Sequence, residues 1–185
     1  MKIVFFGSAH FAVPSLQALI KSKHEVACVV TQPDKQKGRH LELSGTDVKS
    51  IALEAKLKIF QPENINTQES GQFLKSIEAD VFVIIAYGQI LSQEILDIPK
   101  IMPINIHASL LPRYRGAAPI NWAIINAEKK TGITVIYVTA KMDAGPIIMR
   151  EEVEIGDEDT SITLEEKLRN CGAKLLIEAL NSIDK

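Results

Sequence analysis

Two patterns of apolar residues follow one another along the chain, and each predicts one kind of element. Short apolar runs bounded by glycine, proline or polar residues are typical of strands buried on both faces of a parallel sheet. They predict strands at Lys2–Phe6, Glu25–Val30, Lys58–Phe60, Asp80–Ala86, Met102–His107 and Ile133–Thr139, and an extended segment at Ile147–Ile155. Apolar residues three or four positions apart predict helices that begin near Val13, Asp47, Thr67, Ser92, Ile120 and Thr163.

The alternation of strands and helices predicts an α/β fold with a Rossmann-like, doubly wound and mainly parallel sheet. A chain of 185 residues fits a single domain and is long enough to bury a full hydrophobic core. The last helix is expected to start at a capping box formed by Thr163 and Glu166. The sequence contains no internal repeat, linker or low-complexity tract, so we expect one domain.

The polar segment Thr31–Gly45 interrupts this pattern of strands and helices. It carries the basic or near-basic residues Lys35, Lys37, Arg39 and His40. A loop of this length without structure of its own is uncommon in a compact domain and is usually functional or disordered. Its positive charges are typical of a soluble loop, and they are also suited to contacts with phosphates.

Composition excludes several classes of protein. The chain has 21 basic and 23 acidic residues and a net charge of −2, so bulk positive charge does not hold it to nucleic acid. Cys28 and Cys171 lie far apart, which indicates neither a disulfide framework nor a zinc ribbon. The four histidines lack metal-ligand spacing. We therefore expect a protein of the reduced cytoplasm that uses no metal.

Three polar residues are candidates for chemistry. Asn105 and His107 are two positions apart on a predicted strand, so their side chains point to the same face at its carboxyl end, where open α/β sheets bind ligands. With Asp143 they form a set of amide, imidazole and carboxylate that suits acyl transfer. Each also has a plainer interpretation: a histidine of the core, an amide that ties a strand end, and an aspartate bonded to its own turn.

Other functions common in this fold class lack their motifs. The loop Gly7–Phe11 follows the first strand but does not contain G-x-G-x-x-G, and no G-x-x-x-x-G-K-[ST] sequence is present. These absences argue against a dinucleotide or ATP site. No G-x-S-x-G sequence is present to activate a serine, which argues against a serine hydrolase.

Several blocks of sequence match one known superfamily. Its signature is found at Asn105-x-His107, at Ser109-Leu-Leu-Pro112 and at Asp143. On these residues the chain resembles the folate-dependent formyltransferases, and most of all the catalytic domain of the methionyl-tRNA formyltransferase family. The finer match lies in Phe11–Leu16, Thr31–Lys35 with Gly38-Arg39, Phe60–Pro62, Ala86–Leu91 and His107–Pro119. The resemblance runs from the first predicted strand through the last helix.

The resemblance implies an enzyme that transfers the formyl group of 10-formyltetrahydrofolate to the α-amine of initiator methionyl-tRNA. It implies that Asn105, His107 and Asp143 are catalytic and that Arg39 helps to place the acceptor end of the tRNA. The folate would be held by Tyr87, Gly88, Gln89, Ile90, Ser109, Leu110, Leu111 and Pro112. Residues 1–185 would be a catalytic domain, and we expect a cytoplasmic monomer with no membrane or metal partner.

The chain also departs from the family pattern. His10 stands where the family usually has an acidic residue, and residues 39–46 differ in composition from the corresponding loop. The family usually carries a C-terminal β-barrel domain that helps to grip tRNA, which has no counterpart in this sequence. Two alternatives therefore stay open: a formyltransferase for a small amine such as an amino sugar nucleotide or glycinamide ribonucleotide, and a folate-binding module without turnover.

Overall fold

The computed structural model describes residues 1–37 and 42–184 of the chain. Its strands are β1 (Lys2–Gly7), β2 (Glu25–Val30), β3 (Lys35–Lys37), β4 (Glu42–Ser44), β5 (Ile59–Phe60), β6 (Val81–Ile85), β7 (Met102–His107), β8 (Lys130–Tyr137) and β9 (Ile147–Glu154). Its helices are the 3₁₀ helix η1 (His10–Ala12) and the α-helices α1 (Val13–Ile20), α2 (Asp47–Glu54), α3 (Gln68–Ile77), α4 (Gln93–Leu96), α5 (Pro119–Ile125) and α6 (Ser161–Ile183).

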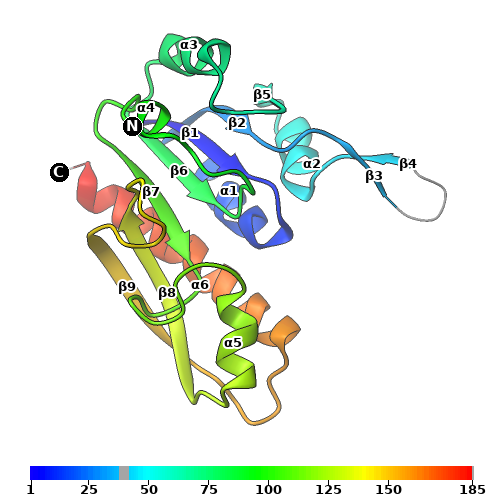
Figure 1. Cartoon of the computed structure of the whole chain (residues 1–185), viewed down its shortest axis with the longest axis vertical. Coiled ribbons are helices and arrows are strands. Elements are labelled where there is room, and N and C mark those ends of the chain that lie inside the picture. The colour runs from blue at the N-terminus through cyan, green and yellow to red at the C-terminus, as the bar shows by residue number, and fades with distance from the viewer. Residues whose placement is uncertain (38–41, 185) are drawn as a thin grey trace.

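One sheet of seven strands organises the fold, in the order β5-β2-β1-β6-β7-β8-β9 (Figure 1). The strands from β5 to β7 pair in parallel, whereas β8 runs antiparallel to both β7 and β9. The predicted fold class, a doubly wound and mainly parallel sheet in a single domain, is confirmed. The chain turns outward in opposite directions from β1 and β6, so the switch point of the sheet lies between these two strands.

The core has two layers, one on each face of the sheet. Consecutive strand residues point to opposite faces, and accordingly Phe5 packs in one cluster with Leu16 of α1 and Leu176 of α6. Phe6 packs in the other cluster with Leu74 of α3 and with residues of α4. Because both faces are covered by helices, the central strands require the continuous apolar runs seen in the sequence.

The segment Thr31–Gly45 differs from the expected loop without structure. Within it, β3 and β4 pair as a short antiparallel ribbon with Lys35 opposite Ser44, and this ribbon projects from the body of the molecule (Figure 1). The two strands have three residues each, with Leu43 as their one apolar residue, which is too short for periodicity to reveal them. Arg39 and His40, singled out from the sequence, lie outside the described residues.

The prediction for the start of the terminal helix was wrong by one turn. Helix α6 is capped by Thr160, whose side chain accepts a hydrogen bond from the Thr163 amide, while the Thr163 hydroxyl accepts one from the Thr160 amide. The residue expected to be the cap is thus its partner, because a threonine hydroxyl can fill either place in a capping box. No helix in the described part of the chain is both long and apolar enough to cross a bilayer.

Candidate active site

Strand β7 presents Asn105 and His107 on one side and buries its isoleucines on the other. Ile104 is fully buried and Ile106 is 4% exposed, both within the core layer that contains α1 and α6. Asn105 and His107 both line a cleft of about 630 Å³ at the carboxyl end of the strand. The predicted alternation along this strand is therefore confirmed.

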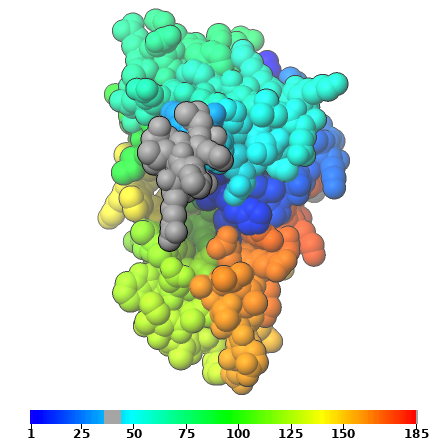
Figure 2. Space-filling model, turned by 90° about the vertical axis from the view of Figure 1, so that its right-hand side faces the viewer, coloured from blue at the N-terminus to red at the C-terminus, as the bar shows by residue number. Residues whose placement is uncertain are grey.

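The cleft opens beside the switch point of the sheet. Ala9 follows β1, Ala86 and Gly88 follow β6, and all three line the cleft. Helix α5 supplies a further wall, and Glu165 of α6, a helix that packs on the same face of the sheet as α5, also lines the cleft. On the face shown in Figure 2, α5 in light green and the first turns of α6 in orange lie below the blue N-terminal segment and the cyan α2. The cleft thus lies beside the switch point, where open α/β sheets bind ligands.

Asp143 reaches this cleft from the connection between β8 and β9. Its Oδ2 accepts a hydrogen bond of 2.8 Å from the Gly116 amide and lies 3.5 Å from Nδ1 of His107. Gly145 allows this connection to close, since a Cβ atom there would lie 1.8 Å from the Tyr137 carbonyl oxygen. The carboxylate therefore contacts residues of the cleft that are far from its own turn in sequence, a point that the sequence had left undecided.

The hydrogen bonds of His107 give its two ring nitrogens different roles. Nε2 lies 2.8 Å from the Tyr114 carbonyl oxygen, and a carbonyl only accepts, so Nε2 carries a proton. In the neutral ring Nδ1 is then a proton acceptor. The distance of 3.5 Å between Nδ1 and Oδ2 of Asp143 is longer than that of a typical direct hydrogen bond. Nδ1 is therefore the nitrogen open to a reacting group.

The turn Ser109–Pro112, predicted to hold folate, follows β7 and is not among the residues that line the cleft. The Ser109 hydroxyl donates to the Arg113 carbonyl at 2.6 Å, and the buried Thr134 of β8 donates to the Ser109 carbonyl at 2.6 Å. Thr134 also accepts from the Leu111 amide. The turn thus fixes the backbone that leads to Tyr114, whose carbonyl oxygen orients His107.

The segment Tyr87–Ile90, also predicted to hold folate, divides into two parts. Tyr87 is 2% exposed and packs edge-on against Phe6, and burial raises the pKa of its phenol to about 12. Gly88, Gln89 and Ile90 line the cleft. Gln89 accepts a hydrogen bond from the Ile65 amide and donates one to the Glu63 carbonyl, which anchors the segment.

A second, smaller cavity of about 190 Å³ adjoins the cleft. Its walls are largely apolar and come from β6, the segment after it, and the end of β8; they include Ile84, Leu91, Leu96, Ile136 and Val138. The two cavities share five lining residues, namely Gln89, Ile90, Asn105, Met142 and Asp143. Two of the three candidate catalytic residues therefore stand where the cavities meet.

Some residues at this site carried no usable signal in the sequence. Glu165 lines the cleft, and Thr134 holds the turn Ser109–Pro112 by hydrogen bonds, but each is an ordinary helix or strand residue in its local pattern. Arg113, which follows the turn Ser109–Pro112, is paired with Glu128. Arg39 lies outside the described residues, so its predicted role stays a prediction.

The geometry agrees with comparisons to known proteins. Residues 1–180 match the model of the formyl transferase family. The chain belongs to this family. The methionyl-tRNA formyltransferase of Thermodesulfovibrio yellowstonii is 49% identical over 183 residues, which are 99% of this chain and 59% of that protein. That of Acetivibrio thermocellus is 48% identical over 184 residues, again 59% of its length. The chain thus spans about three fifths of these curated relatives.

Solved structures of formyl transferases have the same architecture. Phosphoribosylglycinamide formyltransferase of Bacillus halodurans superposes with a TM-score of 0.84 at 27% identity, over 99% of this chain and 95% of that one. A formyltetrahydrofolate deformylase from Pseudomonas syringae superposes with a TM-score of 0.79 at 24% identity, over 97% of this chain and 59% of that one. The resemblance recognised from the Asn105, His107 and Asp143 motif is confirmed at the level of the family.

Proposed function

We propose that this formyl transferase moves the formyl group of 10-formyltetrahydrofolate to the α-amine of initiator methionyl-tRNA. The observation that carries the proposal is the position of Asn105 and Asp143 at the junction of two cavities, beside His107. Two substrates that enter from different sides meet at such a junction. The names of the relatives at 48–49% identity support the choice of substrates.

The smaller cavity suits the ring system of the donor. A flat heteroaromatic ring favours an apolar slot with polar backbone groups at its edge, and the walls here are largely isoleucine, leucine and valine. We propose that Gly88, Gln89 and Ile90 contact the donor. The turn Ser109–Pro112 and the buried Tyr87 would support this site from behind, through the hydrogen bonds and packing described above.

The reaction needs an oxyanion stabiliser and a proton carrier, and the three residues divide these tasks. The amine nitrogen forms a bond to the formyl carbon, negative charge develops on the formyl oxygen, and the amide of Asn105 donates to it. Nδ1 of His107 takes the proton of the amine and returns it to N10 of the folate as the C–N10 bond breaks. Once protonated, His107 lies between two acceptors, the Tyr114 carbonyl and Asp143.

The remaining parts of the proposal concern the acceptor and the protein as a whole. We propose that Arg39 helps to place the acceptor end of the tRNA and that residues 1–185 form the catalytic domain. We also propose that the protein acts as a monomer. The compartment would be the cytoplasm, where charged tRNA is made.

A second acceptor is favoured by one observation. The chain superposes on the phosphoribosylglycinamide formyltransferase of Bacillus halodurans with a TM-score of 0.84 at 27% identity. Glycinamide ribonucleotide is therefore the alternative acceptor, with the same donor and the same three residues.

One assay separates the two acceptors. The protein is incubated with 10-formyltetrahydrofolate that carries a labelled formyl group, and with either charged initiator tRNA or glycinamide ribonucleotide. We expect label to enter methionyl-tRNA at least about tenfold faster, because a site that hydrogen-bonds one acceptor rejects another that leaves its polar groups unpaired. Preferential labelling of glycinamide ribonucleotide would show that this compound, and not methionyl-tRNA, is the acceptor. Labelling of neither acceptor would reject the proposed function.

A further inference from the structure

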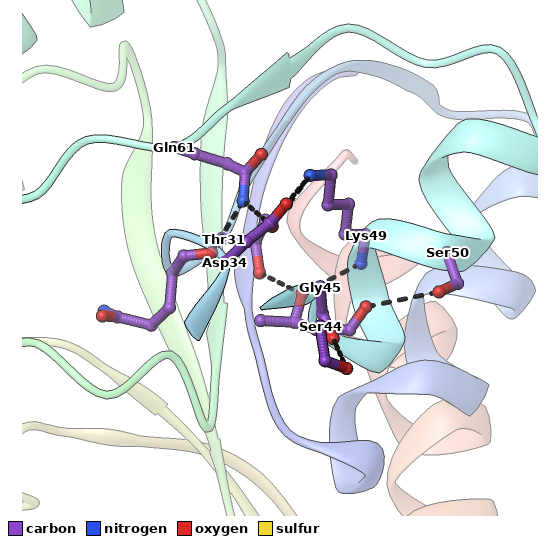
Figure 3. Close-up of polar contacts among 9 residues, drawn as sticks. Thr31, Asp34, Ser44, Gly45, Lys49, Ser50 and Gln61 are labelled. Carbon is purple, nitrogen blue, oxygen red and sulfur yellow. Dashed lines mark hydrogen bonds and ion pairs between the residues drawn. The ribbon is translucent and has the colours of Figure 1, made fainter. Parts of the chain in front are cut away.

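The ribbon of β3 and β4, here called the arm, is fastened at its base by side chains from both of its ends (Figure 3). Thr31 before the arm and Thr46 after it join their hydroxyls at 2.6 Å. Lys49 of α2 donates to both carboxylate oxygens of Asp34, at 2.8 and 2.6 Å. The two chain ends that enter and leave the arm are thus linked twice.

A third link ties this base to the main sheet. The Gln61 amide, which follows β5, donates to the Gln32 carbonyl at 2.9 Å and to Asp34 at 2.8 Å (Figure 3). Hydrogen bonds from Lys49 and Gln61 hold the pKa of Asp34 below its usual range. The side chains of Lys49 and Asp34 are only 21% and 25% exposed, so their charges are turned toward each other and largely away from solvent.

Gly45 provides the space for this contact. A Cβ atom at position 45 would lie 3.0 Å from Cδ of Lys49 and 3.5 Å from Oδ1 of Asp34. A side chain there would have to displace the stem of the lysine. The backbone at the returning end of the arm and the ion pair are therefore packed against each other.

The fastened base forms one wall of a hollow that adjoins the cleft. This hollow of about 320 Å³ is lined by Pro33, Lys35 and Gly45 from the arm side, and by Ser8 and residues up to His10 from the other. Ala9 lines both the hollow and the cleft. Any change in the direction of the arm would therefore reshape the approach to the candidate catalytic residues.

We propose that Asp34 and Lys49 are positioning residues, which hold the arm beside the cleft and thereby set the affinity for the acceptor end of a charged tRNA. This inference rests on the proposed function. The two residues act through the arm, since their charged ends are occupied by each other and by Gln61. Lys35 is exposed and lines the hollow. This arrangement keeps its positive charge available for phosphate.

The proposal and a purely electrostatic effect predict changes of opposite sign in tRNA affinity when Asp34 is replaced. Removal of an acidic charge near a polyanion should tighten binding, because it raises the local positive potential. If Asp34 instead holds the arm, its loss should weaken binding in spite of the more favourable charge. The change Asp34→Asn keeps the size of the side chain and therefore separates these two effects.

The experiment measures steady-state formylation of initiator methionyl-tRNA by the chain and its Asp34→Asn variant. We expect KM for charged tRNA to rise about three- to tenfold, the range for a residue that acts through a second group, with kcat and the KM of the donor unchanged. Lys49→Met should raise the same KM. The KM of the double variant should be no higher than that of the more impaired single variant, because each substitution removes the same contact between Asp34 and Lys49.

Asp184→Asn is the matched control, since it also removes an acidic partner from a lysine pair, with Lys23, which precedes β2 at the opposite end of that strand from Asp34. Amide hydrogen exchange supplies a second readout: in Asp34→Asn the paired amides of Lys35–Lys37 and Glu42–Ser44 should exchange faster, while those of β1 should not. A lower or unchanged KM for Asp34→Asn, or unchanged exchange in the arm, would overturn the proposal. A wild-type chain that formylates no charged tRNA would reject the proposed function and the acceptor role together.

Discussion

His107 has its two ring nitrogens in different surroundings, and this difference supports the role proposed for it. The Tyr114 carbonyl fixes Nε2, while Nδ1 lies beside Asp143, a residue that lines the cleft. Because the Tyr114 carbonyl belongs to a turn that Ser109 and Thr134 hold by hydrogen bonds, the orientation of the ring is built into the backbone. An imidazole held in this way loses little orientational entropy at the moment of proton transfer.

Asn105 has the most direct link to the rate of the reaction. Its side chain lines both cavities, and its proposed partner exists only when the formyl oxygen becomes negative. We expect Asn105→Ala to lower kcat by about 10²- to 10³-fold, as for loss of one oxyanion donor, and to leave the melting temperature nearly unchanged. Steady-state kinetics with thermal unfolding would measure both.

The change Asn105→Asp is the control for shape, because it keeps the size of the side chain and replaces the donor by an acceptor. It should be at least as slow as the alanine variant. Activity near that of the wild type in Asn105→Asp would show that the amide donor has no role in the transition state.

Among the elements, the β8–β9 hairpin brings Asp143 to a strand far from it in sequence. Strand β8 pairs with β7 so that Thr134 lies opposite His107, and the close approach at Gly145 lets the hairpin return over the strand end. Two elements of the sheet therefore set the spacing between the carboxylate and the imidazole. This long-range pairing, rather than the turn sequence itself, makes Asp143 part of the site.

A buried histidine directly before β2 should make stability depend on pH. His24 is 6% exposed, and its Nδ1 lies 3.4 Å from the N-terminal amine of Met1, near Lys23 and Asp184. Burial, followed by the charge of the N-terminus, lowers the pKa of His24 from its ordinary value of 6.5. The unfolded chain therefore binds a proton more readily below that pH, and the folded chain loses stability as the pH falls through it.

We predict that the wild type loses more melting temperature than His24→Asn when the pH is lowered from about 7.5 to about 5.5, by an amount on the order of a few °C. The other titratable groups are the same in both proteins. The difference between the two changes in melting temperature therefore reports on His24. Equal shifts in the two proteins would mean that the imidazole is protonated as easily in the folded chain as in the unfolded one.

For the molecule as a whole, local periodicity and the family motif in the sequence predicted the sheet and the candidate catalytic residues. The apolar runs predicted the mainly parallel sheet, and alternation along β7 put Asn105 and His107 on one side. The β3–β4 arm and its Asp34–Lys49 base were missed, because the strands have only three residues each and Asp34 and Lys49 are 15 residues apart. The cap at Thr160 was missed because the residue three positions after it is a threonine, whereas the usual capping box has glutamate or glutamine there.

The contacts that shape the cleft were also beyond the reach of the sequence. Glu165 comes from the last helix and Ala9 from the first loop, and only the packing of α6 across the sheet brings them to one cleft. Such residues have no feature in the sequence around them that indicates a site. The sequence therefore predicted the candidate catalytic residues, and only the fold shows which residues surround them.

Formyl transfer at the junction of the two cavities, with His107 acting in the transition state, can be tested by comparing donor affinity with transfer rate. The variant to use is His107→Gln, a change that retains a donor for the Tyr114 carbonyl. We predict that the transfer rate falls by about 10²- to 10⁴-fold, while the Kd for the folate stays within about twofold. A parallel loss of folate binding, or a transfer rate equal to that of the wild type, would contradict this role for His107.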